Sequence, residues 1–142
     1  MAATVLLIED SKFIRVTSQR ELTRAGYLVL MATDGENGLR MARESLPDLI
    51  LLDMMLPVIA GADVLRALKE DPLTAHIPVV VLSSLSQKSS IKLRPDDVAG
   101  YIEKSALVSG ESKVLVRALA TAMETKGSPA TSGALKRAAQ TA

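Results

Sequence analysis

A run of aliphatic residues that ends in a single carboxylate constrains the fold of this 142-residue chain most strongly. Residues 49–52 read Leu-Ile-Leu-Leu, Asp53 follows them, and Pro57 and Gly61 lie just beyond. A run this short, starting two residues after Pro47, is typical of a β-strand buried on both faces of a parallel sheet. Open parallel sheets bind ligands at the carboxyl ends of their strands. Asp53 is therefore a candidate reactive group, metal ligand or helix cap.

Four other short apolar runs alternate with segments of helical period. The predicted strands cover residues 5–8, 27–32, 79–82 and 101–103, and the predicted helices run from Ser11 to before Gly26, after Asp34-Gly35, from about Ala62, and from near Gly110 to Thr125. Alternating strands and helices predict βαβ units with right-handed crossovers around a parallel sheet. We expect one domain over residues 1–125 and a flexible tail over 126–142, which is rich in Ser, Gly, Ala and Thr.

Composition excludes several classes of protein. The absence of cysteine rules out disulfides and thiolate metal sites. No segment resembles a signal peptide or approaches the length of a membrane span, so a cytoplasmic protein without membrane contact is expected. The body of the chain offers no basic surface of the kind that binds nucleic acid.

The carboxyl ends of the predicted strands carry the polar groups that suggest a function. Glu9 and Asp10 follow the first strand, Asp53 the third, Ser83 the fourth and Lys104 the fifth. Three carboxylates at adjacent strand ends require a nearby cation, and hard oxygen ligands without histidine or cysteine favour Mg²⁺. A carboxylate beside a metal and a lysine is suited to accept a phosphoryl group. The residues therefore indicate phosphoryl transfer onto Asp53.

Over roughly residues 4–125 the chain resembles the receiver domain of two-component response regulators. The resemblance rests on Glu9-Asp10 after the first strand, on Asp53 with Pro57 and Gly61, and on Ser83, Tyr101 and Lys104 in order and at the family's spacing. It implies an α/β fold, a doubly wound five-stranded parallel sheet of order 2-1-3-4-5, flavodoxin-like, with Asp10 and Asp53 at the switch point.

The resemblance also implies roles for individual residues. Asp53 would accept the phosphoryl group from a histidine kinase or a histidine phosphotransfer protein. Asp10, Asp53 and the backbone carbonyl of Met55 would bind Mg²⁺ directly, and Glu9 would act partly through water. Lys104 would pair with the phosphoryl oxygens.

Two further residues would form the family's switch. Ser83 would hydrogen-bond the phosphoryl group and draw its loop inward, which would let Tyr101 turn from exposed to buried. The chain would then be a signalling module that catalyses only its own phosphotransfer and dephosphorylation, a monomer or weak dimer with an unknown downstream protein target. The alternative is a receiver-like scaffold that binds partners independently of phosphorylation. A hydrolase is disfavoured because Met55 stands where aspartate-nucleophile phosphatases place a second acid.

Three features depart from the family pattern. Ser105 replaces the proline that usually follows the lysine, and the apolar residues 58–60 (Val-Ile-Ala) replace a more polar loop. Pro95 lies where the family places its fourth helix, and proline in a helix interior costs about 3 kcal/mol. We therefore expect a fourth helix that is shortened or irregular, ending by about Leu93, with at most a turn restarting at Pro95.

Overall fold

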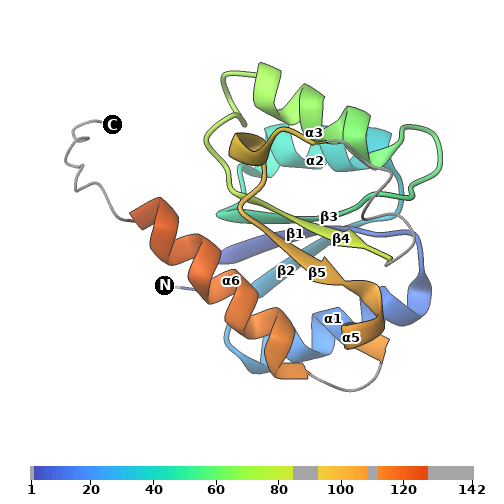
Figure 1. Cartoon of the computed structure of the whole chain (residues 1–142), viewed down its shortest axis with the longest axis vertical. Coiled ribbons are helices and arrows are strands. Elements are labelled where there is room, and N and C mark those ends of the chain that lie inside the picture. The colour runs from blue at the N-terminus through green and yellow to red at the C-terminus, as the bar shows by residue number, and fades with distance from the viewer. Residues whose placement is uncertain (1, 85–92, 109–111, 128–142) are drawn as a thin grey trace.

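The computed structural model describes residues 2–84, 93–108 and 112–127 (Figure 1). Strands and helices alternate along the chain, which confirms the predicted βαβ organisation. The strands are β1 (Thr4–Ile8), β2 (Leu28–Ala32), β3 (Leu49–Asp53), β4 (Val79–Ser83) and β5 (Gly100–Glu103). The helices are α1 (Lys12–Arg24), α2 (Gly35–Ser45), α3 (Gly61–Glu70), α5 (Lys104–Val108) and α6 (Ser112–Gly127), with one 3₁₀ turn, η1 (Pro95–Asp97).

The five strands form one parallel sheet in the order β2-β1-β3-β4-β5, as expected from the resemblance. β1 and β3 pair in register, with Ile8 beside Leu52, and β3 and β4 pair with Asp53 beside Leu82. The strands β1, β3 and β4 are central, which explains their unbroken aliphatic sequence, because both of their faces are covered. β2 and β5 form the two edges (Figure 1).

Helices cover both faces of the sheet and create two aliphatic cores. α1, α5 and α6 pack on one face and α2 and α3 on the other (Figure 1). Successive strand residues point to opposite faces, so Val5 and Leu7 join the core under α1 and α6, whereas Leu6 and Ile8 join the core under α2 and α3.

Polar caps set where the first two helices begin. The backbone N–H of Ile14 donates to the Ser11 Oγ (3.4 Å), and that of Asn37 donates to the Asp34 carboxylate (2.8 Å). Each cap satisfies one of the free amides of a first helical turn. Because Ser11 lies only three residues after β1, the residues between them, Glu9 and Asp10, are held at the carboxyl end of the sheet.

Several boundaries differ from the sequence-based expectation. A short helix, α5, starts at Lys104 and was not predicted; its Leu107 is buried in the core under α1 and α6. The last helix runs to Gly127, two residues past its predicted end, and β2 starts at Leu28 rather than Tyr27. Local pattern locates such ends poorly, because tertiary contacts extend or trim the last turn.

The segment around Pro95 is partly described. Arg94 is extended and Pro95 opens the 3₁₀ turn η1, which confirms the expected restart at Pro95. The expectation that a fourth helix ends by about Leu93 falls on residues 85–92, which lie outside the described part of the chain. The predicted tail beyond Gly127 lies outside it as well.

None of the helices in the described ranges is both long enough and apolar enough to cross a lipid bilayer.

Candidate functional site

Three carboxylates meet at the carboxyl end of the sheet. Glu9 and Asp10 follow β1, and Asp53 ends the adjacent strand β3, so parallel pairing brings them together. One ligand oxygen from each residue lies within 4.8 Å of the other two. Glu9 and Asp53 are fully buried and Asp10 is exposed. The structure thus assembles the acidic cluster that the sequence predicted.

Lys104 supplies the positive charge. Its Nζ lies 2.7 Å from Asp53 Oδ1 and 3.5 Å from Glu9 Oε1. The lysine follows the edge strand β5, and β4 lies between β5 and β3, so its long side chain has to reach past one strand to contact Asp53. One lysine faces two buried carboxylates, and the site keeps an excess of negative charge.

The two oxygens of Asp53 have different surroundings. Oδ1 accepts from Lys104 and from the backbone N–H of Met55, the latter at 3.0 Å. Oδ2 is buried and has no hydrogen-bond partner among the described residues. Buried polar atoms are nearly always paired, so an unpaired carboxylate oxygen here points to a ligand or a reactive role.

The Glu9 carboxylate is fully buried but accepts few hydrogen bonds. Its Oε2 accepts from the backbone N–H of Ser11 at 3.0 Å, and its Oε1 has no hydrogen bond among the described residues. Burial raises the pKa of the Glu9 carboxyl to about 7, and the charge of Asp53 adds to the rise, while the Ser11 amide and Lys104 oppose it. Crowded carboxylates of this kind are the usual setting for a bound cation.

The remaining predicted residues lie on β4, on β5 and in the loop after Asp53. Ser83 is buried at the end of β4, one residue beyond Leu82, which pairs with Asp53. Tyr101, on β5, is 52% exposed. Met55 lies in the loop directly after Asp53, with its side chain exposed.

Arg15 is a residue that the sequence reasoning missed. Its Nη1 donates to the backbone carbonyls of Glu9 (3.2 Å) and Asp10 (2.8 Å) and so ties the loop after β1 to α1. The available signal was its position, one turn into the helix that follows the acidic pair. A surface arginine at that spacing is too common to be recognised without the fold.

The loop between β3 and α3 is tightly constrained. Gly61 closes it, because a Cβ at that position would lie 2.3 Å from the Asp53 carbonyl oxygen. Val58 adopts a φ of 73°, and a hydrogen bond closes the turn around it, from the Ile59 N–H to the Pro57 carbonyl (2.8 Å). Such a φ is strained for a β-branched residue and persists only where the surroundings impose it. Within the apolar loop noted in the sequence, the Val58 side chain is exposed to solvent, whereas Ile59 packs on the core under α2 and α3.

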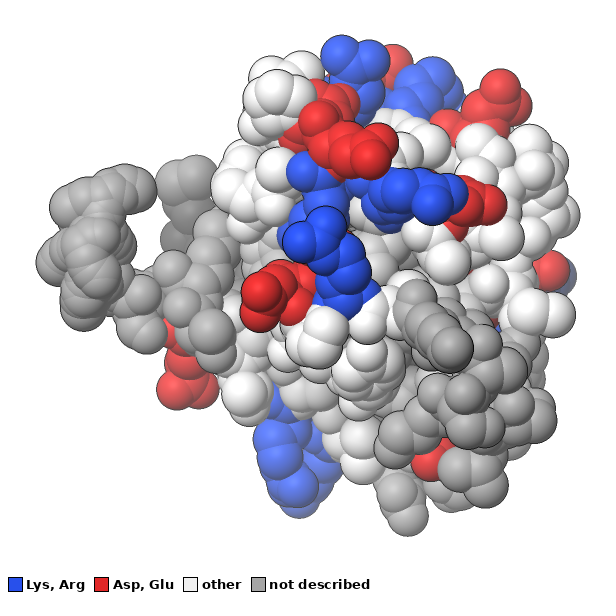
Figure 2. Space-filling model, turned by 45° about the horizontal axis from the view of Figure 1, so that its top comes forward, with Lys and Arg blue, Asp and Glu red and all other residues white. Residues whose placement is uncertain are grey.

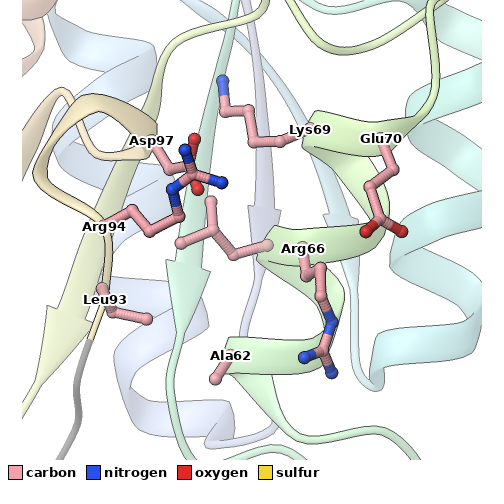
Figure 3. Close-up of a pocket in the computed structure, with 8 residues that line it drawn as sticks. Ala62, Arg66, Lys69, Glu70, Leu93, Arg94 and Asp97 are labelled. Carbon is pink, nitrogen blue, oxygen red and sulfur yellow. The ribbon is translucent and has the colours of Figure 1, made fainter.

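A separate pocket of about 330 Å³ lies between α3 and η1 (Figure 3). None of the acidic-site residues lines it. Figure 3 shows Arg66, Lys69 and Glu70 projecting from α3 in different directions, and Figure 2 shows basic and acidic side chains intermingled on the face that comes forward from the top of Figure 1. The pocket residues are Ala62, Leu65, Arg66, Lys69, Glu70, Leu93, Arg94 and Asp97.

Lys69 has a structural role in this pocket. Its Nζ donates to the carbonyl oxygens of Ala75 (3.1 Å) and Ile77 (2.8 Å), which joins the end of α3 to the loop before β4. Burial lowers the pKa of Lys69, and the nearby Asp97 carboxylate opposes that fall. Among the described residues, the carboxylates that could together hold a metal ion gather at the acidic site and not in this pocket.

Comparisons with known proteins show the family of the chain. The family model described as the response regulator receiver domain matches residues 5–119. The polar-differentiation response regulator DivK of Brucella anthropi is 31% identical over 105 residues, which make up 73% of this chain and 85% of DivK. The response regulator PleD of Caulobacter vibrioides is 44% identical over 85 residues, or 60% of this chain but only 19% of PleD.

Solved structures are also similar. The Mn²⁺-bound form of response regulator Rcp1 aligns with a TM-score of 0.69 at 28% identity, over 80% of this chain and 88% of that one.

Proposed function

The chain belongs to the family of response regulator receiver domains, which are signalling domains of two-component systems, and on that premise we propose that Asp53 accepts a phosphoryl group. The observation that carries this proposal is the state of the Asp53 carboxylate. Lys104 and the Met55 amide hold Oδ1, while Oδ2 is buried without a hydrogen-bond partner among the described residues. One oxygen is therefore fixed and the other is available for reaction.

The donor is a histidine kinase or a histidine phosphotransfer protein. An oxygen of Asp53 forms the new P–O bond as the P–N bond of the donor's phosphohistidine breaks, and the freed imidazole nitrogen keeps the electron pair of that bond. Lys104 then pairs with the transferred phosphoryl oxygens, which disperses their charge. The complete set of acids and the lysine disfavours the alternative of a scaffold that works without phosphate.

The residues at the acidic site fit a divalent cation. Three carboxylates lie within 4.8 Å of one another, two of them buried against a single lysine, and they are the hard ligands that Mg²⁺ prefers. Asp10, Asp53 and the Met55 carbonyl would hold Mg²⁺ directly, with Glu9 acting partly through water. When bound, the ion supplies positive charge that offsets the charge of the phosphoryl oxygens. The Mn²⁺ in the similar Rcp1 structure supports this assignment.

Ser83 and Tyr101 are the proposed switch. Ser83 lies on the strand next to Asp53 and would donate its hydroxyl to the phosphoryl group. Tyr101 is half exposed on the neighbouring strand and would turn inward when the Ser83 loop moves. The output is a change in a protein-binding surface, read by a downstream protein target.

Acetyl phosphate provides the direct test of phosphorylation. With Mg²⁺ present, we expect phosphate-affinity electrophoresis to show a shifted band for the wild type and none for Asp53→Asn. Asp63→Asn serves as the matched control, since Asp63 is an exposed acid on α3. Equal shifts for the wild type and Asp53→Asn, or an unshifted wild type, would remove the proposal.

Magnesium should stabilise the unphosphorylated protein. Binding to the native state alone adds about 1.4 kcal/mol to the free energy of unfolding at ten times Kd. Thermal melts with Mg²⁺ and with a chelator should therefore differ, and Asp10→Ala should remove most of the difference. Glu36→Ala, which replaces an exposed acid outside the site, should keep it. If the wild type melts at the same temperature with Mg²⁺ and with the chelator, the proposal that Mg²⁺ binds at this site is wrong.

A further inference from the structure

Asp10 is placed differently from the other two carboxylates of the acidic site. Glu9 and Asp53 are fully buried, and each accepts a hydrogen bond from the backbone N–H two residues further on. Asp10 is exposed, and within the described ranges its carboxylate accepts no hydrogen bond and forms no ion pair. One of its oxygens nevertheless lies within 4.8 Å of ligand oxygens of both buried residues. The position of that carboxylate therefore depends on the backbone that carries it.

Arg15 holds this stretch of backbone. A single guanidinium nitrogen, Nη1, donates to the carbonyl of Glu9 (3.2 Å) and to that of Asp10 (2.8 Å). No other donor in the described part of the chain reaches either carbonyl. Helical side chains lean toward the amino terminus of their helix, so an arginine one turn into α1 reaches back to the loop after β1. Removing the guanidinium would remove the hydrogen bonds that fix both carbonyls.

The contacts of Arg15 leave the Asp10 carboxylate available. The guanidinium forms no ion pair with any carboxylate among the described residues, whereas Lys104 pairs directly with Asp53 and Glu9. A group that fixed Asp10 through its carboxylate would compete with a cation for the same oxygens. Because Arg15 binds the carbonyl instead, it can fix Asp10 while the carboxylate stays free to bind an ion.

Helix stability does not account for a positive charge at this position. The dipole of a helix disfavours cations near its amino terminus. The first turn of α1 nevertheless has no acidic residue, and Lys12 and Arg15 both lie among the first four residues of the helix. Hydrogen bonds from a charged donor are stronger than neutral ones, so the two bonds to the loop supply a physical reason for an arginine here.

We propose that Arg15 is a positioning residue for the divalent cation, because it keeps the exposed Asp10 carboxylate beside Glu9 and Asp53 before the ion binds. The inference rests on the proposed function, whose cation it concerns. It adds a residue that touches neither the ion nor the phosphoryl group. Without Arg15 the ion has to order the loop as it binds, which lowers its affinity. Partners that orient metal ligands change metal affinity by about tenfold to a hundredfold.

Titration of the unphosphorylated protein with magnesium chloride tests this role. The Kd for Mg²⁺ follows from the rise of the melting temperature with Mg²⁺ concentration. We expect the Kd of Arg15→Met to be about tenfold higher than that of the wild type. Arg20→Met is the matched control and should keep the Kd of the wild type. Arg20 is an exposed arginine on the same helix, without a hydrogen bond or ion pair among the described residues, so its loss removes the same charge.

Charge alone predicts a change in the opposite direction. Removing a positive charge next to a cation site lowers the repulsion that the ion meets. If Arg15 acted only through its charge, Arg15→Met would therefore bind Mg²⁺ more tightly. An Arg15→Met protein that binds Mg²⁺ at least as tightly as the wild type would overturn the inference. An equal loss of affinity in Arg20→Met, or a wild type that binds no Mg²⁺, would overturn it too.

Amide hydrogen exchange in the presence of a chelator gives a second measurement and shows whether the variant is folded. The Ser11 N–H, which donates to Glu9 Oε2 (3.0 Å), should exchange faster in Arg15→Met than in the wild type. The amides of the central strands β1, β3 and β4 should keep their protection. Unchanged exchange at Ser11 would show that Arg15 does not hold the loop. Faster exchange throughout the central strands would show a general role in the fold, and either result contradicts the inference.

Neither measurement requires Asp53 to be phosphorylated. If the wild type shows no shifted band with acetyl phosphate, the proposed phosphoacceptor role is wrong, and the ratio of the two Kd values still decides the role of Arg15. If the wild type is phosphorylated but Arg15→Met binds Mg²⁺ normally, the proposed function stands and this inference fails.

Discussion

Replacing Gly61 with alanine should lower the free energy of unfolding by about 3 kcal/mol. The added Cβ would lie 2.3 Å from the Asp53 carbonyl oxygen and 2.5 Å from Met54 Cα, both of them backbone atoms. Neither atom can move away easily, because hydrogen bonds fix this stretch of backbone. The Met54 N–H donates to the Leu82 carbonyl (3.1 Å), and the Met55 N–H donates to the Asp53 side chain (3.0 Å). Relief therefore requires α3 to move away from the sheet.

Urea denaturation measures this effect, and the chain supplies a matched control. Gly100→Ala places its Cβ no nearer than 3.8 Å to the methyl groups of Val80, an ordinary contact. That variant should be as stable as the wild type or slightly more so, since alanine loses less backbone freedom than glycine on folding. A Gly61→Ala protein within about 1 kcal/mol of the wild type would show that the loop after β3 adapts more easily than its contacts indicate.

Replacing Lys104 with methionine should have an effect of similar size on stability in the absence of divalent cations. The change leaves two fully buried carboxylates, Glu9 and Asp53, without the ammonium group that now lies 2.7 Å from one and 3.5 Å from the other. Removing one partner of a buried charge pair costs about 3 kcal/mol. Phosphorylation by acetyl phosphate should fall as well, because the lysine no longer pairs with the phosphoryl oxygens.

A second substitution separates loss of charge from loss of packing. Asp53→Asn combined with Lys104→Met removes the carboxylate that lies 2.7 Å from the ammonium group together with that group, so the double variant should recover most of the lost stability. Lys113→Met, at an exposed lysine on α6, should match the wild type in denaturation. If Lys104→Met is as stable as the wild type in the presence of a chelator, the ion pair at the centre of the site contributes nothing to the fold.

Most of the architecture was predictable from local pattern. Short aliphatic runs that alternate with helical periods predicted the strands and the parallel sheet, because a strand buried on both faces has to be apolar along its whole length. The same logic predicted from the sequence that Glu9, Asp10 and Asp53 lie close together, since the carboxyl ends of parallel strands meet at one edge of the sheet. The strand order itself came from the resemblance to receiver domains, and the structure confirms it.

The contacts that set the chemistry depend on how distant segments pack. Three features of the site result from packing between elements. Lys104 contacts Asp53 from beyond β4, and Arg15 binds the carbonyls after β1. Asp53 Oδ2 lacks a partner among the described residues. Periodicity describes the neighbours of a residue along its own element, and it carries no information about which side chain from another element approaches it.

The same limit explains why local pattern did not predict the short helix that starts at Lys104, the left-handed backbone at Val58 or the uncovered edge at β2. Aliphatic residues predict a strand equally well in the middle of a sheet and at its rim. Local pattern alone does not decide which strand is left at the edge, because that outcome depends on the order in which all five strands pair.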